Sequence, residues 1–222
     1  MKRDEIDAAE ITRETYDQIA SGYARRVNDL VSGTWVGTFE KSLLDKLVAL
    51  VRTGGGCTAQ ILDIGCGYGK DTFYLSQRKK VTAIGLDYSS GILSEARKTF
   101  PGVCFVQMDM RNFGFCGNHF HGVWANGCVY HVPRGELMRV LIEVAYVLKS
   151  SGVFSFNFKV GTGEQLEKNP RSYGGRPRFY AYYGIEEMRG LVAHADLKVI
   201  EVDPYPKAIL GERIVQMWAL KP

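Results

Sequence analysis

Long apolar runs are missing from this 222-residue sequence. Its longer apolar stretches, such as residues 81–86, fall far short of the roughly 20 residues that a membrane-spanning helix needs. The opening residues, MKRDEIDAAE, also lack the apolar core of a signal peptide. We therefore expect a cytoplasmic protein with no membrane partner.

Long basic runs and paired cysteines are missing as well. The net charge is +4 and the longest basic run is Arg78-Lys79-Lys80, so nucleic acid would meet no continuous positive track. The five cysteines form no CxxC pair, which argues against a zinc site and against a disulfide framework. We expect no nucleic-acid partner, no metal, and reduced thiols that are mostly buried.

The hydrophobic pattern changes about a quarter of the way along the chain. Leu43, Leu44 and Leu47 recur at helical spacing until Gly54-Gly55-Gly56 ends the run. From Gln60 onward, short β-rich runs alternate with helical segments, as in right-handed βαβ units and a doubly wound parallel sheet. The expected strands are 61–64, 81–86, 103–108, 122–125, 153–158, 198–202 and 214–220, and the clearest helices are 90–99, 133–148 and 185–195.

The length and the 45% content of hydrophobic residues fit a single α/β domain over residues 1–222. Within it, residues 1–56 are expected to form an N-terminal helical cap, and residues 57–222 a Rossmann-like core.

Three alternate glycines follow the first expected strand, in Asp63-Ile64-Gly65-Cys66-Gly67-Tyr68-Gly69. Ligands of open α/β sheets lie beyond the carboxyl ends of the strands, and glycine lets the backbone approach them closely. A ligand-free turn is the alternative for this motif alone. The nicotinamide spacing GxGxxG fails, because Lys70 stands where its third glycine belongs, and Asp63 would repel a diphosphate. A cationic ligand without phosphate fits better.

Acidic residues also end the next two expected strands. Asp87 can accept hydrogen bonds from both ribose hydroxyls of a nucleoside. Asp109 can accept from an adenine amino group while the following backbone N–H, of Met110, reaches a ring nitrogen. Taken singly, either acid is more commonly solvated or a helix cap, but three such acids in order favour a nucleoside site.

These residues resemble the class I S-adenosylmethionine-dependent methyltransferases over roughly residues 14–220. The resemblance rests on DxGxGxG at Asp63–Gly69, the acid Asp87, Met108-Asp109-Met110, Gly122–Asn126 with Tyr130-His131, and the Val147–Gly152 turn, where Ser150 and Ser151 replace residues that are often Pro and Gly. It implies a seven-stranded sheet with its last strand antiparallel, S-adenosylmethionine as cofactor and S-adenosylhomocysteine as product. It says little about the substrate.

The resemblance also implies roles for individual residues. Around the cofactor it places Gly65, Cys66 and Gly67 at the methionine part and ribose, Asp63 near the amino group, Asp87 at the ribose, Asp109 and Met110 at adenine, Tyr88 and Ile92 on the adenine faces, and Tyr16, Tyr23 and Asn126 toward the methionine end. The alternative for Tyr16 and Tyr23 is simple packing of their helix on the sheet.

Three residues after the fourth expected strand, Asn126, Tyr130 and His131, are the catalytic candidates. Methyl transfer needs no protein nucleophile, since the cofactor carries the reactive group. His131 is the best general base because imidazole titrates near neutral pH, although it could instead hold its loop. The sequence Ala125-Asn126-Gly127-Cys128 lacks the Pro-Pro-aromatic pattern of adenine and glutamine amide methylation. We expect an oxygen acceptor.

Cations and tyrosines alternate between residues 159 and 183, where Lys159, Arg178 and Tyr180 are the expected substrate contacts, together with Trp35 nearer the start. Guanidinium forks suit carboxylates, and aromatic faces suit planar bodies. The substrate would then be a small anionic or aromatic molecule, and the alternative is a solvated arginine-rich loop followed by a packing strand. A monomer or homodimer is expected. The rival function is a catalytically silent nucleotide-binding regulator on the same fold.

Overall fold

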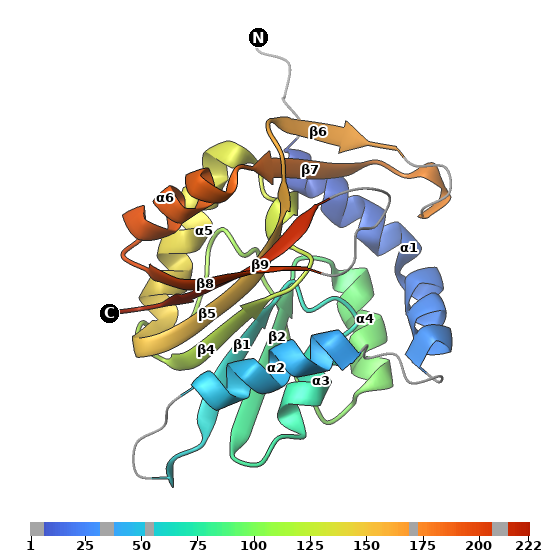
Figure 1. Ribbon diagram of the computed structural model, residues 1–222. Helices are drawn as coiled ribbons and strands as arrows, with labels where there is room; N and C mark the ends of the chain where they lie inside the picture. Colours follow the sequence, from blue (N-terminus) through green and yellow to red (C-terminus); the bar gives the residue numbers. More distant parts are fainter. Residues whose placement is uncertain (1–6, 32–37, 52–55, 169–172, 206–212) are drawn as a thin grey trace.

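A long, mostly parallel sheet runs through the computed structural model, which describes residues 7–31, 38–51, 56–168, 173–205 and 213–222 (Figure 1). The helices are α1 (Ala8–Val31), α2 (Thr38–Leu50), α3 (Lys70–Ser76), α4 (Ser90–Thr99), α5 (Arg134–Val147) and α6 (Ile185–His194), with short 3-10 turns at Val129–His131 and Tyr173–Gly175. The strands are β1 (Ala59–Ile64), β2 (Val81–Asp87), β3 (Cys104–Gln107), β4 (Phe120–Ala125), β5 (Leu148–Val160), β6 (Glu164–Glu167), β7 (Arg178–Tyr183), β8 (Lys198–Pro204) and β9 (Ile214–Leu220).

The sheet has the predicted doubly wound topology. Strands β3, β2, β1, β4 and β5 lie side by side and run parallel, β9 pairs antiparallel with β5, and β8 pairs antiparallel with β9. The expected α/β fold with an antiparallel last strand is therefore confirmed. Register brings Ile64 beside Leu86 and Asp87 beside Gln107, so the carboxyl ends of β1, β2 and β3 meet at one edge.

A β6–β7 hairpin was not expected in the arginine-rich stretch. Strand β7 joins the end of β5 through the pairs Lys159–Tyr182 and Val160–Tyr183, and β6 pairs antiparallel with β7. Aromatic residues dominate β7, RFYAYY, and favour a half-buried strand. Lys159 lies on β5 and Arg178 on β7, whereas Arg176 lies in the exposed loop before β7, which agrees with the alternative of a solvated loop followed by a strand for Arg176 alone.

Helices cover the two faces of the sheet. On one face α5 and α6 pack against strand residues such as Leu62 and Phe156. On the other, Leu44 and Leu47 of α2 are fully buried with Ile61 and Trp124. Each such leucine contributes about 1.5–3 kcal/mol when it leaves water. Helix α2 is therefore part of the core.

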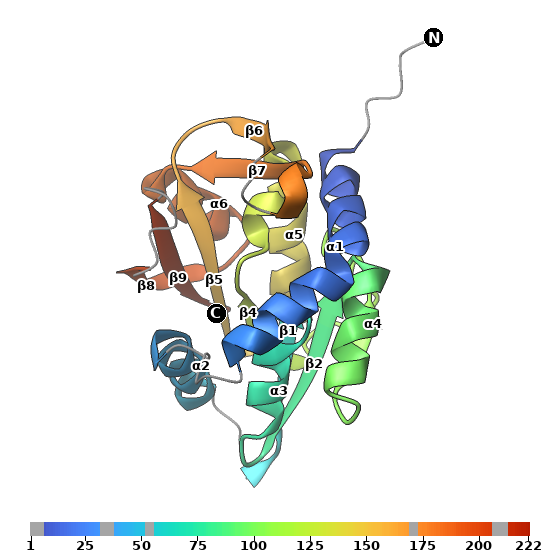
Figure 2. The same ribbon diagram turned by 90° about the vertical axis from the view of Figure 1, so that its right-hand side faces the viewer.

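Helix α1 takes a different position from α2. It lies along α4 and reaches the β6–β7 hairpin, as Figures 1 and 2 show. The Thr12 hydroxyl accepts a hydrogen bond from the backbone of Phe179 on β7, at 2.9 Å. The Thr15 hydroxyl donates to the carbonyl of Pro177. Among the described N-terminal residues, only α1 lies over the carboxyl edge of the sheet, because α2 packs into the core.

The cysteines differ from the prediction. Cys66 and Cys128 are buried, but Cys57, Cys104 and Cys116 are exposed, so most of the thiols are not buried. In the described ranges, no helix combines the length and apolar character needed to cross a membrane.

Candidate functional site

A cavity of about 400 Å³ opens at the carboxyl edge of the sheet, beneath α1. Nearly all of the residues selected from the sequence line it: Tyr16, Tyr23, Gly65, Cys66, Gly67, Asp87, Tyr88, Ile92, Asp109, Met110, Asn126, Tyr130, His131, Lys159, Arg178 and Tyr180. Asp63 does not line it, and Trp35 falls outside the described residues. Residues as far apart in the sequence as Tyr16 and Tyr180 are thus brought to one site.

The glycines in the turn after β1 have two different roles: two allow close packing, and one leaves the backbone open to a ligand. A Cβ on Gly65 would lie 2.3 Å from Cβ of Cys128, and one on Gly69 would lie 2.3 Å from the Phe105 ring, so packing excludes side chains at both positions. Gly67 has φ +56°, and a Cβ there would meet nothing within 4 Å. Gly67 is therefore the glycine whose open side faces the cavity.

The Asp87 carboxylate is held rigidly at the end of β2. Its Oδ2 accepts from the Gly67 backbone N–H and its Oδ1 from the Ser89 N–H, both at 2.9 Å. Burial raises the pKa of Asp87, and these backbone hydrogen bonds oppose the rise. Because each carboxylate oxygen can accept more than one hydrogen bond, both oxygens keep capacity for a ligand hydroxyl.

Asp63 lies below the cavity and outside its wall. The side chain is 2% exposed, and the Thr72 hydroxyl donates to its Oδ2 at 2.6 Å. Burial, reinforced by the neighbouring Asp71, raises the pKa of Asp63 well above its usual value. We therefore no longer expect the direct contact with a ligand amino group that the resemblance implies for Asp63.

Two lining residues that the sequence analysis did not select, Lys70 and Asp71, begin α3. Asp71 Oδ2 accepts from the indole N–H of Trp124 at 3.0 Å and from the side-chain amide of Asn126 at 3.2 Å. Asn126 also accepts from Asn157 on β5. Their position immediately after the glycine motif was the available signal.

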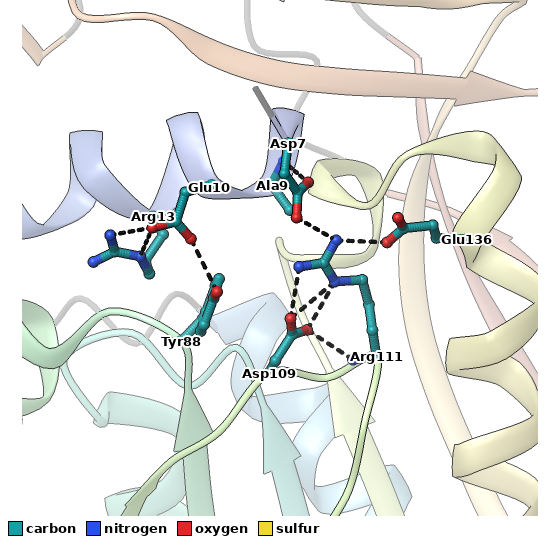
Figure 3. Close-up of polar contacts among 8 residues, drawn as sticks. All are labelled: Asp7, Ala9, Glu10, Arg13, Tyr88, Asp109, Arg111 and Glu136. Atoms are coloured by element: carbon teal, nitrogen blue, oxygen red, sulfur yellow. Dashed lines mark hydrogen bonds and ion pairs between the residues drawn. The ribbon is translucent and has the colours of Figure 1, made fainter. Parts of the chain in front are cut away.

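At the Asp109 end of the cavity, Arg111 gathers three carboxylates (Figure 3). Its Nε donates to Asp109 Oδ1 at 3.0 Å and Oδ2 at 2.9 Å, and its Nη1 lies 2.8 Å from Asp7 and 2.6 Å from Glu136. The hydrogen bond to Asp109 is the main cause of a raised pKa at Arg111. This cluster ties the start of α1 to the loop after β3 and to α5.

A second tie joins α1 to the loop after β2. The Tyr88 hydroxyl donates to Glu10 at 2.9 Å, and Glu10 also pairs with Arg13 (Figure 3). Asp17 accepts from the Ser89 hydroxyl at 2.6 Å and from the Gly91 N–H at 2.8 Å. The cap is thus bound to residues that themselves border the cavity.

Tyr16 and His131 meet on the opposite wall. Nδ1 of His131 lies 2.7 Å from the Phe179 carbonyl oxygen, so Nδ1 carries the proton and Nε2 is left as an acceptor. The hydroxyl of Tyr16 is 3.5 Å from Nε2. Burial lowers the pKa of His131 to about 3, with Arg178 and Lys159 adding to the decrease and the Phe179 hydrogen bond opposing it. The expectation that His131 titrates near neutral pH is therefore wrong.

Tyrosine rings and two cations complete this wall. Lys159 is 5% exposed. Its ammonium lies 3.6 Å from the centroid of the Tyr180 ring and 5.4 Å from that of the Tyr130 ring. The guanidinium of Arg178 lies 5.3 Å from the Tyr180 centroid. Arg176, which precedes β7, is exposed and donates to Gln18 outside the cavity lining.

The arrangement matches a known family. Residues 61–152 match the model of a family described as a methyltransferase domain. Residues 61–152 therefore belong to a methyltransferase domain. The family predicted from the sequence is confirmed.

Relatives of the methyltransferase domain are similar over parts of their length. The trans-aconitate 2-methyltransferase of Methylobacterium nodulans is 45% identical over 62 residues, which are 28% of this chain and 24% of that protein. The malonyl-[acyl-carrier protein] O-methyltransferase of Geobacter sulfurreducens is 26% identical over 175 residues, which are 73% of this chain and 64% of that protein. The chain therefore spans less than two-thirds of either relative.

Among solved structures, the Burkholderia thailandensis 1,6-didemethyltoxoflavin-N1-methyltransferase is similar in fold. It was solved with 1,6-didemethyltoxoflavin and S-adenosylhomocysteine bound. The TM-score is 0.65 at 20% identity, over 96% of this chain and 88% of that one. This likeness concerns the fold of the methyltransferase domain.

Proposed function

We propose that this chain transfers a methyl group from S-adenosylmethionine to a carboxylate oxygen of a small anionic molecule. The observation that carries the proposal is the single cavity in which Asp87, Gly67 and the glycine turn lie on one side and Lys159, Arg178 and His131 line the wall beside Tyr180. The proposal assigns the first group of residues to the nucleoside of the cofactor and the second to the anionic acceptor.

The residues of the cavity fit S-adenosylmethionine. Asp87 has two fixed oxygens for ribose hydroxyls, and the open side of Gly67 permits close approach of a ligand. The carboxylates Asp71 and Asp87 line the cavity, and their negative charge favours a sulfonium and an ammonium and disfavours a diphosphate. S-adenosylmethionine supplies an activated methyl group at its sulfonium, which an in-line acceptor can displace.

The acceptor is inferred from the opposite wall. Lys159 and Arg178 present positive charge among tyrosine rings, and a partly buried cation pairs more strongly with a carboxylate than an exposed one. The two relatives described above are named for trans-aconitate, a tricarboxylate, and for a malonyl group, also a carboxylate. The nitrogen acceptor in the name of the Burkholderia enzyme is the alternative.

His131 fits a carboxylate better than a hydroxyl acceptor. With a pKa of about 3, its imidazole is neutral at physiological pH but is too weak a base to deprotonate an alcohol or a phenol. A carboxylate is already ionised and needs no base. In the proposal, the Tyr16 hydroxyl donates to the carboxylate and orients it, while Lys159 and Arg178 hold its charge.

The test is methyl transfer from cofactor labelled in the methyl group to a panel of small di- and tricarboxylates, beginning with trans-aconitate. A methyl ester is cleaved by alkali and releases the label as methanol, whereas a methyl group on nitrogen or carbon is retained. We expect alkali-labile product. Alkali-stable product would overturn the carboxylate acceptor, and cofactor binding without transfer to any acceptor would favour the silent regulator.

A further inference from the structure

Two adjacent opposite charges, Lys70 and Asp71, line the same cavity as Gly67 and Asn126. The Lys70 side chain is 21% exposed and that of Asp71 is 11% exposed. The Lys70 ammonium lies 3.4 Å from Asp71 Oδ1. The chain therefore presents a close pair of opposite charges at the edge of the glycine turn, and no particular ligand group has been assigned to this pair above.

The Asp71 carboxylate is fixed through one oxygen only. Oδ2 accepts from the side chains of Trp124 and Asn126, which sets the orientation of the group. Oδ1 is buried, and within the described part of the chain it receives no hydrogen bond, the Lys70 ammonium lying outside hydrogen-bond geometry. A buried carboxylate oxygen without a donor is costly, so a ligand group that donates to it would bind favourably.

We infer that Lys70 and Asp71 together bind the amino-acid end of the cofactor. Asp71 Oδ1 accepts from the α-ammonium, and the Lys70 ammonium donates to the α-carboxylate. An α-amino acid carries its two charges on adjacent groups, and this pair of side chains offers the complementary charges side by side. The inference rests on the proposed function, because it requires S-adenosylmethionine in this cavity.

This assignment transfers to Asp71 the role that the family resemblance implies for Asp63. Asp63 is engaged by Thr72, is 2% exposed and does not line the cavity. Asp71 lines the cavity and is linked to Asn126, which directly follows β4 in the segment that leads to the acceptor wall at His131. Binding at Asp71 would thus fix the methionine end close to the strand that leads to that wall.

The experiment measures the affinities of three nucleosides by titration calorimetry, so that binding of the ammonium and of the carboxylate can be told apart. S-adenosylhomocysteine carries ammonium and carboxylate, its decarboxylated analogue carries the ammonium alone, and 5′-methylthioadenosine carries neither. Asp71→Asn is isosteric and keeps an oxygen for Trp124. We expect it to weaken the first two ligands by about 10- to 100-fold and 5′-methylthioadenosine by less than about threefold. Lys70→Met should weaken only S-adenosylhomocysteine, by about tenfold.

The matched controls are Glu95→Gln and Lys98→Met, which break an exposed ion pair on α4 outside the cavity lining and should alter none of the affinities. Retained binding of 5′-methylthioadenosine by Asp71→Asn shows that the variant is folded. Equal weakening of all three ligands, or of none, would overturn the inference and leave the proposed function standing. If the wild-type chain binds none of the three, the proposed function fails as well.

Discussion

Replacing Lys159 by Met tests how the acceptor wall recognises charge. The ammonium lies 3.6 Å from the centroid of the Tyr180 ring and 5.7 Å from that of Tyr182, at the end of β5. Methionine keeps the length and the apolar contact of the side chain but removes the positive charge. The substitution therefore separates the electrostatic role of Lys159 from its packing.

The expected effect follows from the burial of Lys159, which is 5% exposed. Loss of one shielded partner of a charge pair costs about 2–3 kcal/mol of binding, which is about a 30- to 150-fold rise in KM for a carboxylate acceptor. The affinity for S-adenosylhomocysteine should stay within about threefold, because the charge is lost from the acceptor wall. Protein stability should change by no more than about 1 kcal/mol, because the lost cation–π contacts are offset by the desolvation that a buried ammonium no longer requires.

The assay is steady-state methyl transfer to the best carboxylate of the panel, with cofactor affinity measured separately by calorimetry. Arg176→Met is the control, since Arg176 lies on the same segment but is exposed and contacts Gln18. A KM for Lys159→Met within about threefold of wild type, or an equal rise in Arg176→Met, would refute the reasoning.

Three further predictions follow from the site. Asp87→Ala should weaken S-adenosylhomocysteine at least about tenfold in calorimetry through loss of hydroxyl acceptors, and unchanged affinity would contradict its placement at the ribose. Because the folded pKa of His131, about 3, lies below its unfolded value, the unfolded chain binds the extra proton and stability falls as the pH drops from about 6.5 toward 3. In urea unfolding between pH 7.5 and 5, wild type should therefore lose about 1–2 kcal/mol more than His131→Asn, and equal losses would argue against the buried neutral imidazole. Limited proteolysis within residues 8–31 should slow when S-adenosylhomocysteine binds and quicken in Arg111→Met, whose cluster holds α1 down, and equal rates in all three samples would exclude a ligand-coupled cap.

Much of the fold could be predicted because local sequence and tertiary structure agree. The expected helix 90–99 coincides with α4, and strand 214–220 coincides with β9, since both have clear periodicity and clear ends. The β6–β7 hairpin was missed because its short strands lie in a stretch rich in glycine and arginine, and β7 is stabilised by β5 and α1, which are distant in sequence.

Site residues could be predicted where a sequence motif fixes the backbone. They could not be predicted where packing between distant segments determines how a side chain is placed. Asp87 and Gly67 follow from the strand-end rule and both line the cavity. The lowered pKa of His131 follows from its burial by distant segments, and the Asp63 and Arg111 side chains are held by Thr72 and Asp7 respectively. No pattern near these residues in the sequence indicates such partners.

The central claim is that this cavity binds S-adenosylmethionine through the strand ends of β1 and β2. Titration calorimetry of the full chain with S-adenosylmethionine, S-adenosylhomocysteine and NADH tests it most directly. We predict micromolar binding of both sulfur nucleosides and none of NADH, whose diphosphate would meet the carboxylates Asp71 and Asp87 in the cavity. Binding of NADH with no binding of either sulfur nucleoside would contradict the account.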